Sequence, residues 1–481
     1  MKRETSFILV LLIITLITRL PFLPQHALIR DEAIYAQMID EFLEKPTLVP
    51  HFLGYEVAWR PVLFVLPYAL IISPMNSLPL PVEGIYRFPS LIFALLTTVV
   101  MYFLVKELYG NEELAFLSTL IYTTTALVIY VNSSLLADTL LVLLILLSTY
   151  AYVKGRNDER YFILAGVLSF SAYMVKTVIA FMIPLLALAY YFFGNRKMLT
   201  NRFFLISMLG IPIAIVAYYF MFSDPSTIIG EYMGNVMGRF VGEKNLAQAL
   251  AGSVVPFVFT TLPWLGFYLT GIWKHWKGNG FMLAWAFLII FPVFFGSLMP
   301  WYYLIVILPL SIFAALSVVG KKIDLLTVAF SSFFIIAALT ATVFFYDAKE
   351  EAWGQREAGL FLAGKNNTLL IGEYMPTTIF YELHNEGRTD FCWVMSRNSS
   401  GVDKRYLDSV IYGYNVSSSY NFSTRVNDMF WDERDLKLPC DITKFDYVVT
   451  RGVNASLMED DTNYSVLREF EENIIVYERI R

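Results

Sequence analysis

Long apolar runs, separated by short polar stretches, fill the first three quarters of the chain. A helix needs about 20 apolar residues to cross a membrane, and most of the runs approach that length. The runs that we predict to cross are Phe7–Leu23, Phe88–Val105, Leu114–Val131, Thr139–Val153, Phe162–Val175, Val178–Phe193, Phe203–Phe222, Val254–Trp273, Phe281–Leu298, Trp301–Val319 and Leu325–Phe345. The pattern predicts an all-α polytopic membrane protein with about 11 transmembrane helices.

A shorter apolar run, Val62–Ile72, decides the sidedness. If it does not cross, the basic loops all lie in the cytoplasm, as the positive-inside rule requires. Those loops carry Lys154, Arg156 and Arg160, then Arg196, Lys197 and Arg202, then Lys274 and Lys277, then Lys321 and Lys322. We therefore predict a re-entrant or interfacial segment, a cytoplasmic N-terminus and an extracytoplasmic C-terminal part, in the cell membrane.

After residue 345 the apolar stretches become short, and a small extracytoplasmic α/β domain is expected over 346–481. The transmembrane domain would be 1–345, with juxtamembrane helices in its first outer loop, 24–87. The predicted strands are Thr368–Ile371, Thr389–Val394, Phe445–Thr450 and Ile474–Tyr477, with a helix at Pro376–Glu386. Several Asn-x-Ser/Thr triplets support an exterior location. The only two cysteines, Cys392 and Cys440, would allow one disulfide there.

The first outer loop opens with residues 29–44, whose apolar positions recur at helical spacing. The apolar stripe consists of Ile34, Tyr35, Met38, Ile39, Phe42 and Leu43, and the polar face of Glu32, Gln37, Asp40, Glu41 and Glu44. This pattern predicts a helix on the membrane surface with its apolar side down. Asp31 and Glu32 begin it, either as ordinary helix-start acids or as catalytic carboxylates near the lipid boundary.

Composition agrees with a membrane location. The chain is 57% hydrophobic and 16% charged, with a mean hydropathy of +0.56, which excludes an ordinary soluble domain. The net charge of −5 gives no sign of a nucleic-acid partner. The four histidines are scattered, and no zinc-binding pattern occurs.

Charged residues collect at the ends of spans and in loops on the predicted outer face. They are Asp31, Glu32, Glu56, Arg60, Arg87, Asp138, Lys176, Asp224, Glu231, Arg239, Glu243 and Lys244. Charge near hydrocarbon is unfavourable unless it is paired or hydrated, so this concentration indicates a polar cavity. Simpler explanations exist: Asp138 could cap a helix, Arg60 and Arg87 could snorkel, and Arg239 could be solvated. Lys176, between two apolar runs, is harder to explain in that way.

Carboxylates and cations above a groove of apolar helices suit a substrate with an anionic head and a lipid tail. A polyprenyl-phosphate sugar is such a molecule. Arginine and lysine would bind its phosphate, and a carboxylate would remove a proton from the acceptor hydroxyl.

Several motifs resemble a known group in their order and sidedness. The run Asp31-Glu32-Ala33-Ile34-Tyr35-Ala36 looks like the Asp-Glu motif of polyprenyl-phosphate-dependent glycosyltransferases with the GT-C fold. The likeness is strongest to the family 39-like branch of lipid A aminoarabinose transferases and protein O-mannosyltransferases. The other stretches similar to that branch are Val49–Gly54, Trp59-Arg60-Pro61, Tyr86–Ser90, Asp138, Met174–Thr177 and Leu262–Leu265.

The resemblance implies an inverting transferase that uses a dolichyl- or undecaprenyl-phosphate sugar at the outer face. Asp31 would be the main catalytic carboxylate, supported by Glu32 and Asp138. The residues implied to contact phosphate or acceptor are Arg60, Lys176 and Arg239, with Tyr302 or Tyr303 also able to reach the phosphate. The stretch Leu298–Leu304 lacks a lysine typical of the aminoarabinose transferases, so the acceptor stays open among a lipid, a glycan and a protein.

Two other classes of membrane protein fit the sequence less well. A transporter or lipid-linked sugar flippase would be expected to show paired repeats and polar groups at mid-membrane, and no repeat is visible. A non-catalytic anchor would not need so many spans. A divalent cation is also an open question, since Asp31, Glu32 and Asp138 could ligate one if they converge.

Overall fold

The computed structural model describes residues 3–29, 31–57, 61–221, 246–287, 300–320, 331, 333–342, 353–365, 368–371, 377–378, 380–381, 384, 391–396, 409–413, 446–451, 464–470 and 474–480. These residues fall into two compact units. The larger unit holds the helices before residue 24 and from 61 to 342. The smaller unit holds residues 24–57 together with the C-terminal residues from 353 onward.

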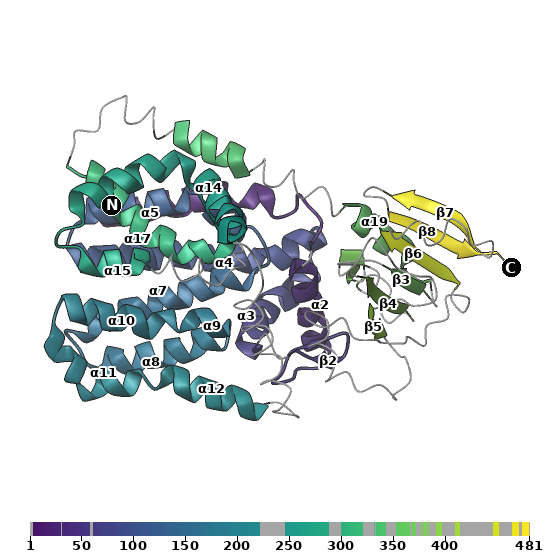
Figure 1. Ribbon diagram of the computed structural model, residues 1–481, viewed down its shortest axis with the longest axis horizontal. Coiled ribbons are helices and arrows are strands. Elements are labelled where there is room, and N and C mark those ends of the chain that lie inside the picture. The colour runs from purple at the N-terminus through teal and green to yellow at the C-terminus, as the bar shows by residue number, and fades with distance from the viewer. Residues whose placement is uncertain are drawn as a thin grey trace. The chain divides into compact units, whose positions relative to one another are not determined.

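Apolar helices make up the larger unit, and many of them lie side by side (Figure 1). Their bounds are α1 Arg3–Ile17, η1 Leu20–Phe22, α3 Val62–Ile72, η2 Ser73–Met75, α4 Val82–Tyr109, α5 Glu112–Thr123, α6 Ala126–Asn132, α7 Ala137–Gly155, α8 Arg160–Tyr173, α9 Thr177–Ala180, α10 Met182–Phe193, η3 Arg196–Thr200, α11 Arg202–Ser207, α12 Gly210–Met221, α14 Leu246–His275, α15 Gly280–Phe287, η4 Pro300–Tyr303 and α17 Leu304–Val318. Within the described ranges, five helices are long and apolar enough to cross a membrane, or six if one bent pair counts as a span. The predicted multi-pass helical class is confirmed, while the number of about 11 spans stays a prediction.

The helix predicted over Leu114–Val131 is not continuous. α5 and α6 meet at a bend of 69° around Thr123, Thr124 and Thr125. The hydroxyls of Thr124 and Thr125 donate to carbonyls one turn earlier, at 2.7 and 2.8 Å. Arg19 Nη2 donates to the Thr123 carbonyl at 2.9 Å. Side-chain bonds of this kind compete with the helical ladder and bend it, which hydropathy alone does not reveal.

The short apolar run in the first outer loop forms α3 and η2. Together they extend from Val62 to Met75. At 1.5 Å per residue this helix is about 20 Å long, well below the roughly 30 Å of a hydrocarbon core. Its length therefore agrees with the predicted re-entrant or interfacial segment.

The turn between α4 and α5 follows from its residues. Gly110 ends α4 at φ 66°, in the left-handed region that glycine adopts readily, and its N–H donates to the Lys106 carbonyl at 2.8 Å. Asn111 caps α5 by accepting the N–H of Leu114 at 3.0 Å. Lys106 also pairs with Glu112 across the turn, at 2.8 Å. Capping and charge together stabilise a tight connection between two apolar helices.

In the smaller unit, α2 spans Asp31–Glu44, close to the predicted bounds. Glu32 and Gln37, which we expected on the polar face, are both buried. Gln37 Nε2 donates to Glu41 at 2.9 Å, and the Glu32 carboxylate accepts the N–H of Ile29 at 3.3 Å. The predicted polar face is wrong at these two positions, because each side chain has a local polar partner that permits burial.

A two-residue turn links β1, His51–Phe52, to β2, Tyr55–Glu56. Leu53 and Gly54 have φ values of 55° and 81°, the pair of positive angles that a type I′ turn needs. Leucine is strained there, since its Cβ crowds the following carbonyl. The carboxylate of Glu41 on α2 accepts both turn N–H groups, at 2.6 and 2.9 Å, and so stabilises the turn.

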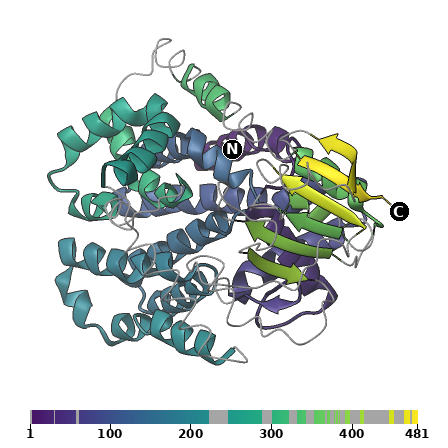
Figure 2. The same cartoon turned by 45° about the vertical axis from the view of Figure 1, so that its right-hand side comes forward.

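The C-terminal residues form a six-stranded sheet, as Figures 1 and 2 show. Its order is β5-β4-β3-β6-β8-β7, with β3 parallel to β4 and β6 and the remaining pairs antiparallel. The strands are β3 Thr368–Ile371, β4 Phe391–Ser396, β5 Ser409–Gly413, β6 Tyr447–Arg451, β7 Tyr464–Phe470 and β8 Ile474–Arg479, and helix α19, Trp353–Leu362, contacts β7 and β8. The predicted α/β character is confirmed. The domain boundaries stay a prediction, and Cys440 lies outside the described residues.

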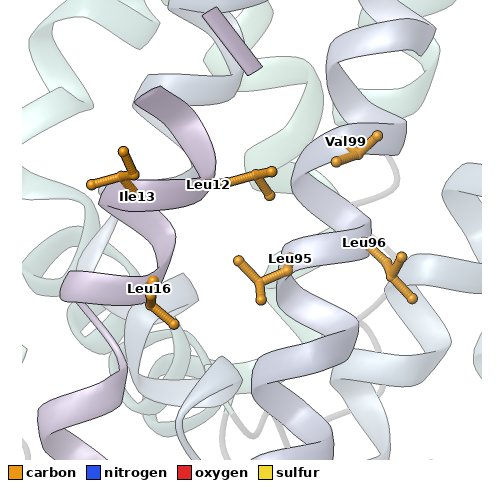
Figure 3. Close-up of a pocket in the computed structure, with 6 residues that line it drawn as sticks. All are labelled: Leu12, Ile13, Leu16, Leu95, Leu96 and Val99. Carbon is orange, nitrogen blue, oxygen red and sulfur yellow. The ribbon is translucent and has the colours of Figure 1, made fainter. Parts of the chain in front are cut away.

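An aliphatic groove of about 370 Å³ lies between α1 and α4 of the larger unit (Figure 3). Its lining residues are Leu12, Ile13, Leu16, Leu95, Leu96 and Val99. Ile13, Leu16 and Leu96 are each more than a third exposed, as expected of side chains that face lipid. All of the described side chains that line the groove are aliphatic.

Candidate active site

Asp138 and Lys176 form a buried ion pair in the larger unit. The Lys176 Nζ lies 2.8 Å from each carboxylate oxygen of Asp138. The two side chains are 5% and 7% exposed. The sequence predicted both residues as candidates because of their sidedness, and the structure brings them together.

Local helix ends explain where each charge sits. Asp138 is in the first turn of α7, where the helix dipole favours an anion. The Lys176 N–H donates to the Ala172 carbonyl at 3.0 Å and so closes the last turn of α8. Lys176 therefore leaves that helix at its carboxyl end, where the dipole favours a cation. Both dipoles support the same ion pair.

Tyr302, in η4, joins this pair. Its ring lies under the Lys176 ammonium, with 4.5 Å from Nζ to the ring centroid. A buried ammonium over an aromatic face gains about 2 kcal/mol from the cation–π interaction. Tyr303 points elsewhere: it is 1% exposed, and its ring packs 4.9 Å from that of Phe257. Of the two predicted tyrosines, Tyr302 is the one whose ring faces the ammonium of Lys176.

Two simpler explanations are contradicted. The N-cap of α7 is Leu136, so Asp138 does not cap the helix and instead forms an ion pair with Lys176. Arg87 does not snorkel to water, since it is 0% exposed and donates to the Leu23 carbonyl at 3.1 Å. A buried guanidinium needs partners, and this bond links α4 to the end of the first span.

Asp31 and Glu32 lie at the start of α2, in the smaller unit. Asp31 is the first helical residue and is half-buried, whereas Glu32 is 2% exposed. The N–H of Glu32 donates to the Ile29 carbonyl at 2.8 Å, and its carboxylate accepts from the N–H of Ile29. This reciprocal pair resembles a capping box. Glu32 therefore stabilises the helix start, while Asp31 is the more accessible carboxylate.

The remaining predicted site residues are not tested by the structure. Arg60 and Arg239 lie outside the described residues. Across the parts of the chain that are described, no three His, Cys, Asp or Glu side chains gather as a set of metal ligands. The ligand set predicted for a divalent cation, Asp31 and Glu32 with Asp138, is divided between the two units and stays a prediction.

Sequence reasoning missed Arg19. It is 0% exposed, and its guanidinium donates to the Thr18 hydroxyl at 2.6 Å and to the Thr123 carbonyl at 2.9 Å. Its position inside the first apolar run could have revealed it, because an ionised side chain there is tolerated only when it is paired or hydrogen-bonded.

The comparisons with known proteins agree with one another. Residues 68–220, which include Asp138 and Lys176, match the family described as dolichyl-phosphate-mannose-protein mannosyltransferase. The undecaprenyl phosphate-alpha-4-amino-4-deoxy-L-arabinose arabinosyl transferase of Yersinia pestis is 24% identical over 316 residues, which are 59% of this chain and 54% of that protein. The Yersinia enterocolitica enzyme of the same name is 24% identical over 308 residues, again 59% of this chain and 54% of that enzyme. The chain thus spans about half the length of the curated relatives that it matches.

Solved structures decide the fold. ArnT from Cupriavidus metallidurans bound to undecaprenyl phosphate superposes with a TM-score of 0.70 at 12% identity, over 99% of this chain and 98% of that one. The chain has the GT-C fold. The arabinofuranosyltransferase AftD from Mycobacteria shares it more distantly, with a TM-score of 0.51 at 13% identity over 99% of this chain and 40% of that one. The predicted GT-C fold is confirmed.

Proposed function

We propose that this GT-C protein is an integral membrane glycosyltransferase that uses a polyprenyl-phosphate sugar. The donor would be undecaprenyl- or dolichyl-linked, and the acceptor a lipid, a glycan or a protein at the outer membrane face. The observation that carries the proposal is the buried Lys176–Asp138 pair with Tyr302, in a fold shared with ArnT, which was solved bound to undecaprenyl phosphate. Burying two charges is unfavourable for folding, so such a pair is a functional candidate.

In this proposal, each charge has a role in a single displacement. The acceptor oxygen attacks the anomeric carbon, and its proton passes to the carboxylate of Asp31. The bond from that carbon to the phosphate oxygen breaks, and its electron pair stays with the polyprenyl phosphate. Attack opposite the leaving group inverts the anomeric centre.

Lys176 would act on the leaving group. Negative charge grows on the carrier phosphate as the bond breaks, and a preorganised cation stabilises that charge. Asp138 and Tyr302 hold the ammonium in place, so little reorganisation is needed during the reaction. Arg60 and Arg239 would add further phosphate contacts, and Glu32 would hold the start of the helix that carries Asp31.

We also propose the orientation, with a cytoplasmic N-terminus and an extracytoplasmic C-terminal domain. Its support is the positive-inside distribution of the basic loops. Membrane-impermeant thiol labelling of single cysteines introduced at Arg156 and at Arg468 in a chain without Cys392 and Cys440 checks it. Labelling of intact cells at 468 but not at 156 is expected, and the reverse pattern contradicts the orientation.

A reconstituted transfer assay tests the proposed activity. Purified protein in nanodiscs receives a radiolabelled polyprenyl-phosphate sugar, with native membranes as the source of acceptor. We expect labelled acceptor and free polyprenyl phosphate to appear together. The same protein is also reconstituted in sealed vesicles, where a flippase would move the intact donor between leaflets without releasing the carrier. Movement without release would therefore reject the transferase in favour of a transporter.

A further inference from the structure

Both backbone groups of Leu28, its N–H and its C=O, form hydrogen bonds with side chains from the C-terminal part of the chain. The hydroxyl of Thr377 donates to the Leu28 carbonyl at 2.8 Å. The Leu28 N–H donates to the hydroxyl oxygen of Tyr381 at 3.0 Å. All three residues are at most 1% exposed, and they belong to the same compact unit.

These two bonds matter because Leu28 lies outside any helix or strand. Buried N–H and C=O groups in such a segment need partners, and leaving one unpaired is unfavourable by about 1–3 kcal/mol. Within the described part of the chain, neither backbone group of Leu28 forms a hydrogen bond with another backbone group. Its path is therefore set by side chains about 350 residues later in the sequence.

The constraint passes directly to Asp31. Ile29 follows Leu28 and exchanges two hydrogen bonds with Glu32, one to each backbone group of Ile29. Asp31 lies between these anchored positions, at the first residue of α2. A shift of Leu28 would thus move the helix start and the carboxylate of Asp31 with it.

A third contact holds the same helix further along. His384 Nδ1 lies 3.0 Å from the carboxylate of Asp40, which is in the third turn of α2. His384 stacks on Phe380, with 5.2 Å between ring centroids. Thr377, Tyr381 and His384 have the 4- and 3-residue spacing of one helical face, and each of the three is helical. These three side chains therefore contact the chain at Leu28, just before α2 begins, and at Asp40 within α2.

We propose that Thr377, Tyr381 and His384 are positioning residues for Asp31. The C-terminal domain thereby determines where the catalytic carboxylate of Asp31 lies. This inference rests on the function proposed above. It assigns the domain a role in the rate of sugar transfer, beyond being attached to the transferase.

Neighbouring threonines provide a matched test. Thr377 and Thr378 are equally buried, but across the described residues the Thr378 hydroxyl has no hydrogen-bond partner. Thr377→Val and Thr378→Val make the same chemical change, and only the first removes a bond to Leu28. Thr377→Ser keeps the hydroxyl and should restore the bond.

Two readouts are compared in purified protein in nanodiscs: kcat and KM for an undecaprenyl-phosphate sugar, and hydrogen exchange over residues 26–33. Thr377→Val and Tyr381→Phe should lower kcat by about tenfold to a hundredfold and leave the donor KM within about twofold, since misplacing a catalytic group acts on the chemical step. Exchange over 26–33 should rise in both variants. Thr378→Val and Thr377→Ser should resemble the wild type in both readouts.

Each outcome has one meaning. Faster exchange with an unchanged kcat overturns the inference and leaves the transferase intact. Unchanged exchange in folded Thr377→Val overturns it as well, whatever the rate. If the wild type transfers no sugar from any polyprenyl donor, the proposed function fails and the inference fails with it, even where exchange shows that Thr377 orders the loop.

Discussion

Replacing Lys176 and Asp138, singly and together, separates the role of the ion pair in folding from its role in catalysis. Lys176→Met removes the ammonium while keeping most of the side-chain length. It leaves the Asp138 carboxylate, 5% exposed, without the cation that lies 2.8 Å from both of its oxygens. Asp138→Leu leaves the opposite charge unpaired. The double variant removes both charges and fills the space with apolar atoms.

The structure predicts opposite trends in stability and activity. Breaking a buried pair from one side destabilises a protein by about 3–5 kcal/mol, whereas replacing both partners by apolar residues is often neutral. Each single variant should therefore unfold at a markedly lower denaturant concentration, and the double variant should recover most of that loss. Activity should not recover, because removing a preorganised charge that stabilises a transition state lowers kcat by about a hundredfold or more.

The assay pairs denaturant unfolding in micelles with single-turnover sugar transfer in nanodiscs, on the same preparations. Lys154→Met is a control at a second lysine–carboxylate pair, with Glu107, whose side chains are 27% and 20% exposed. Its loss should change stability by no more than about 1 kcal/mol and leave the rate unaltered. If the double variant regains both stability and wild-type turnover, the pair is purely structural and the proposed role of Lys176 is refuted.

Three further outcomes are expected. Arg19→Met should lower the free energy of unfolding by about 3 kcal/mol, because the buried hydrogen bonds from its guanidinium to Thr123 and Thr18 are lost. Unfolding in micelles measures this loss, and the exposed control Arg156→Met should change the free energy of unfolding little. Glu41→Ala should speed hydrogen exchange in the β1–β2 turn, because two hydrogen bonds worth about 2–4 kcal/mol in total are lost. The exposed Glu44→Ala is the control, and equal exchange in both variants would contradict the role of Glu41 in the turn. Burial raises the pKa of Glu41 in the folded state, so the extra stability that comes from its protonation is full below the ordinary carboxyl pKa and is lost as the pH rises through the raised value, while the carboxylate oxygens still accept the two turn N–H groups. A pH series of unfolding should show this loss in the wild type and not in Glu41→Gln.

Hydropathy predicted the helical parts of the chain well, since the spacing and length of apolar runs report directly on burial. The first turn of α7 and the bounds of α2 lie within two residues of the ranges expected. The bend between α5 and α6 was not predictable in this way. It depends on where threonine hydroxyls and Arg19 donate, and those bonds leave the apolar pattern unchanged.

The sequence predicted which kinds of residue form the candidate site, but not which of them pair with each other. Sidedness selected Asp138 and Lys176, which are 38 residues apart, but only coordinates show that they share one ion pair. The contacts of Leu28 with Thr377 and Tyr381 left no trace in the sequence, because an ordinary buried leucine uses its backbone and not its side chain there.

The measurement that bears most directly on the central claim is single-turnover release of undecaprenyl phosphate from a sugar-loaded donor, comparing the wild type with Asp31→Asn. The substitution keeps the size of the side chain and removes the proton acceptor, and Glu44→Gln on the same helix is the matched control. We predict that Asp31→Asn lowers the rate by about a hundredfold or more, with unfolding unchanged and Glu44→Gln at the wild-type rate. Release by Asp31→Asn at the wild-type rate would contradict the account.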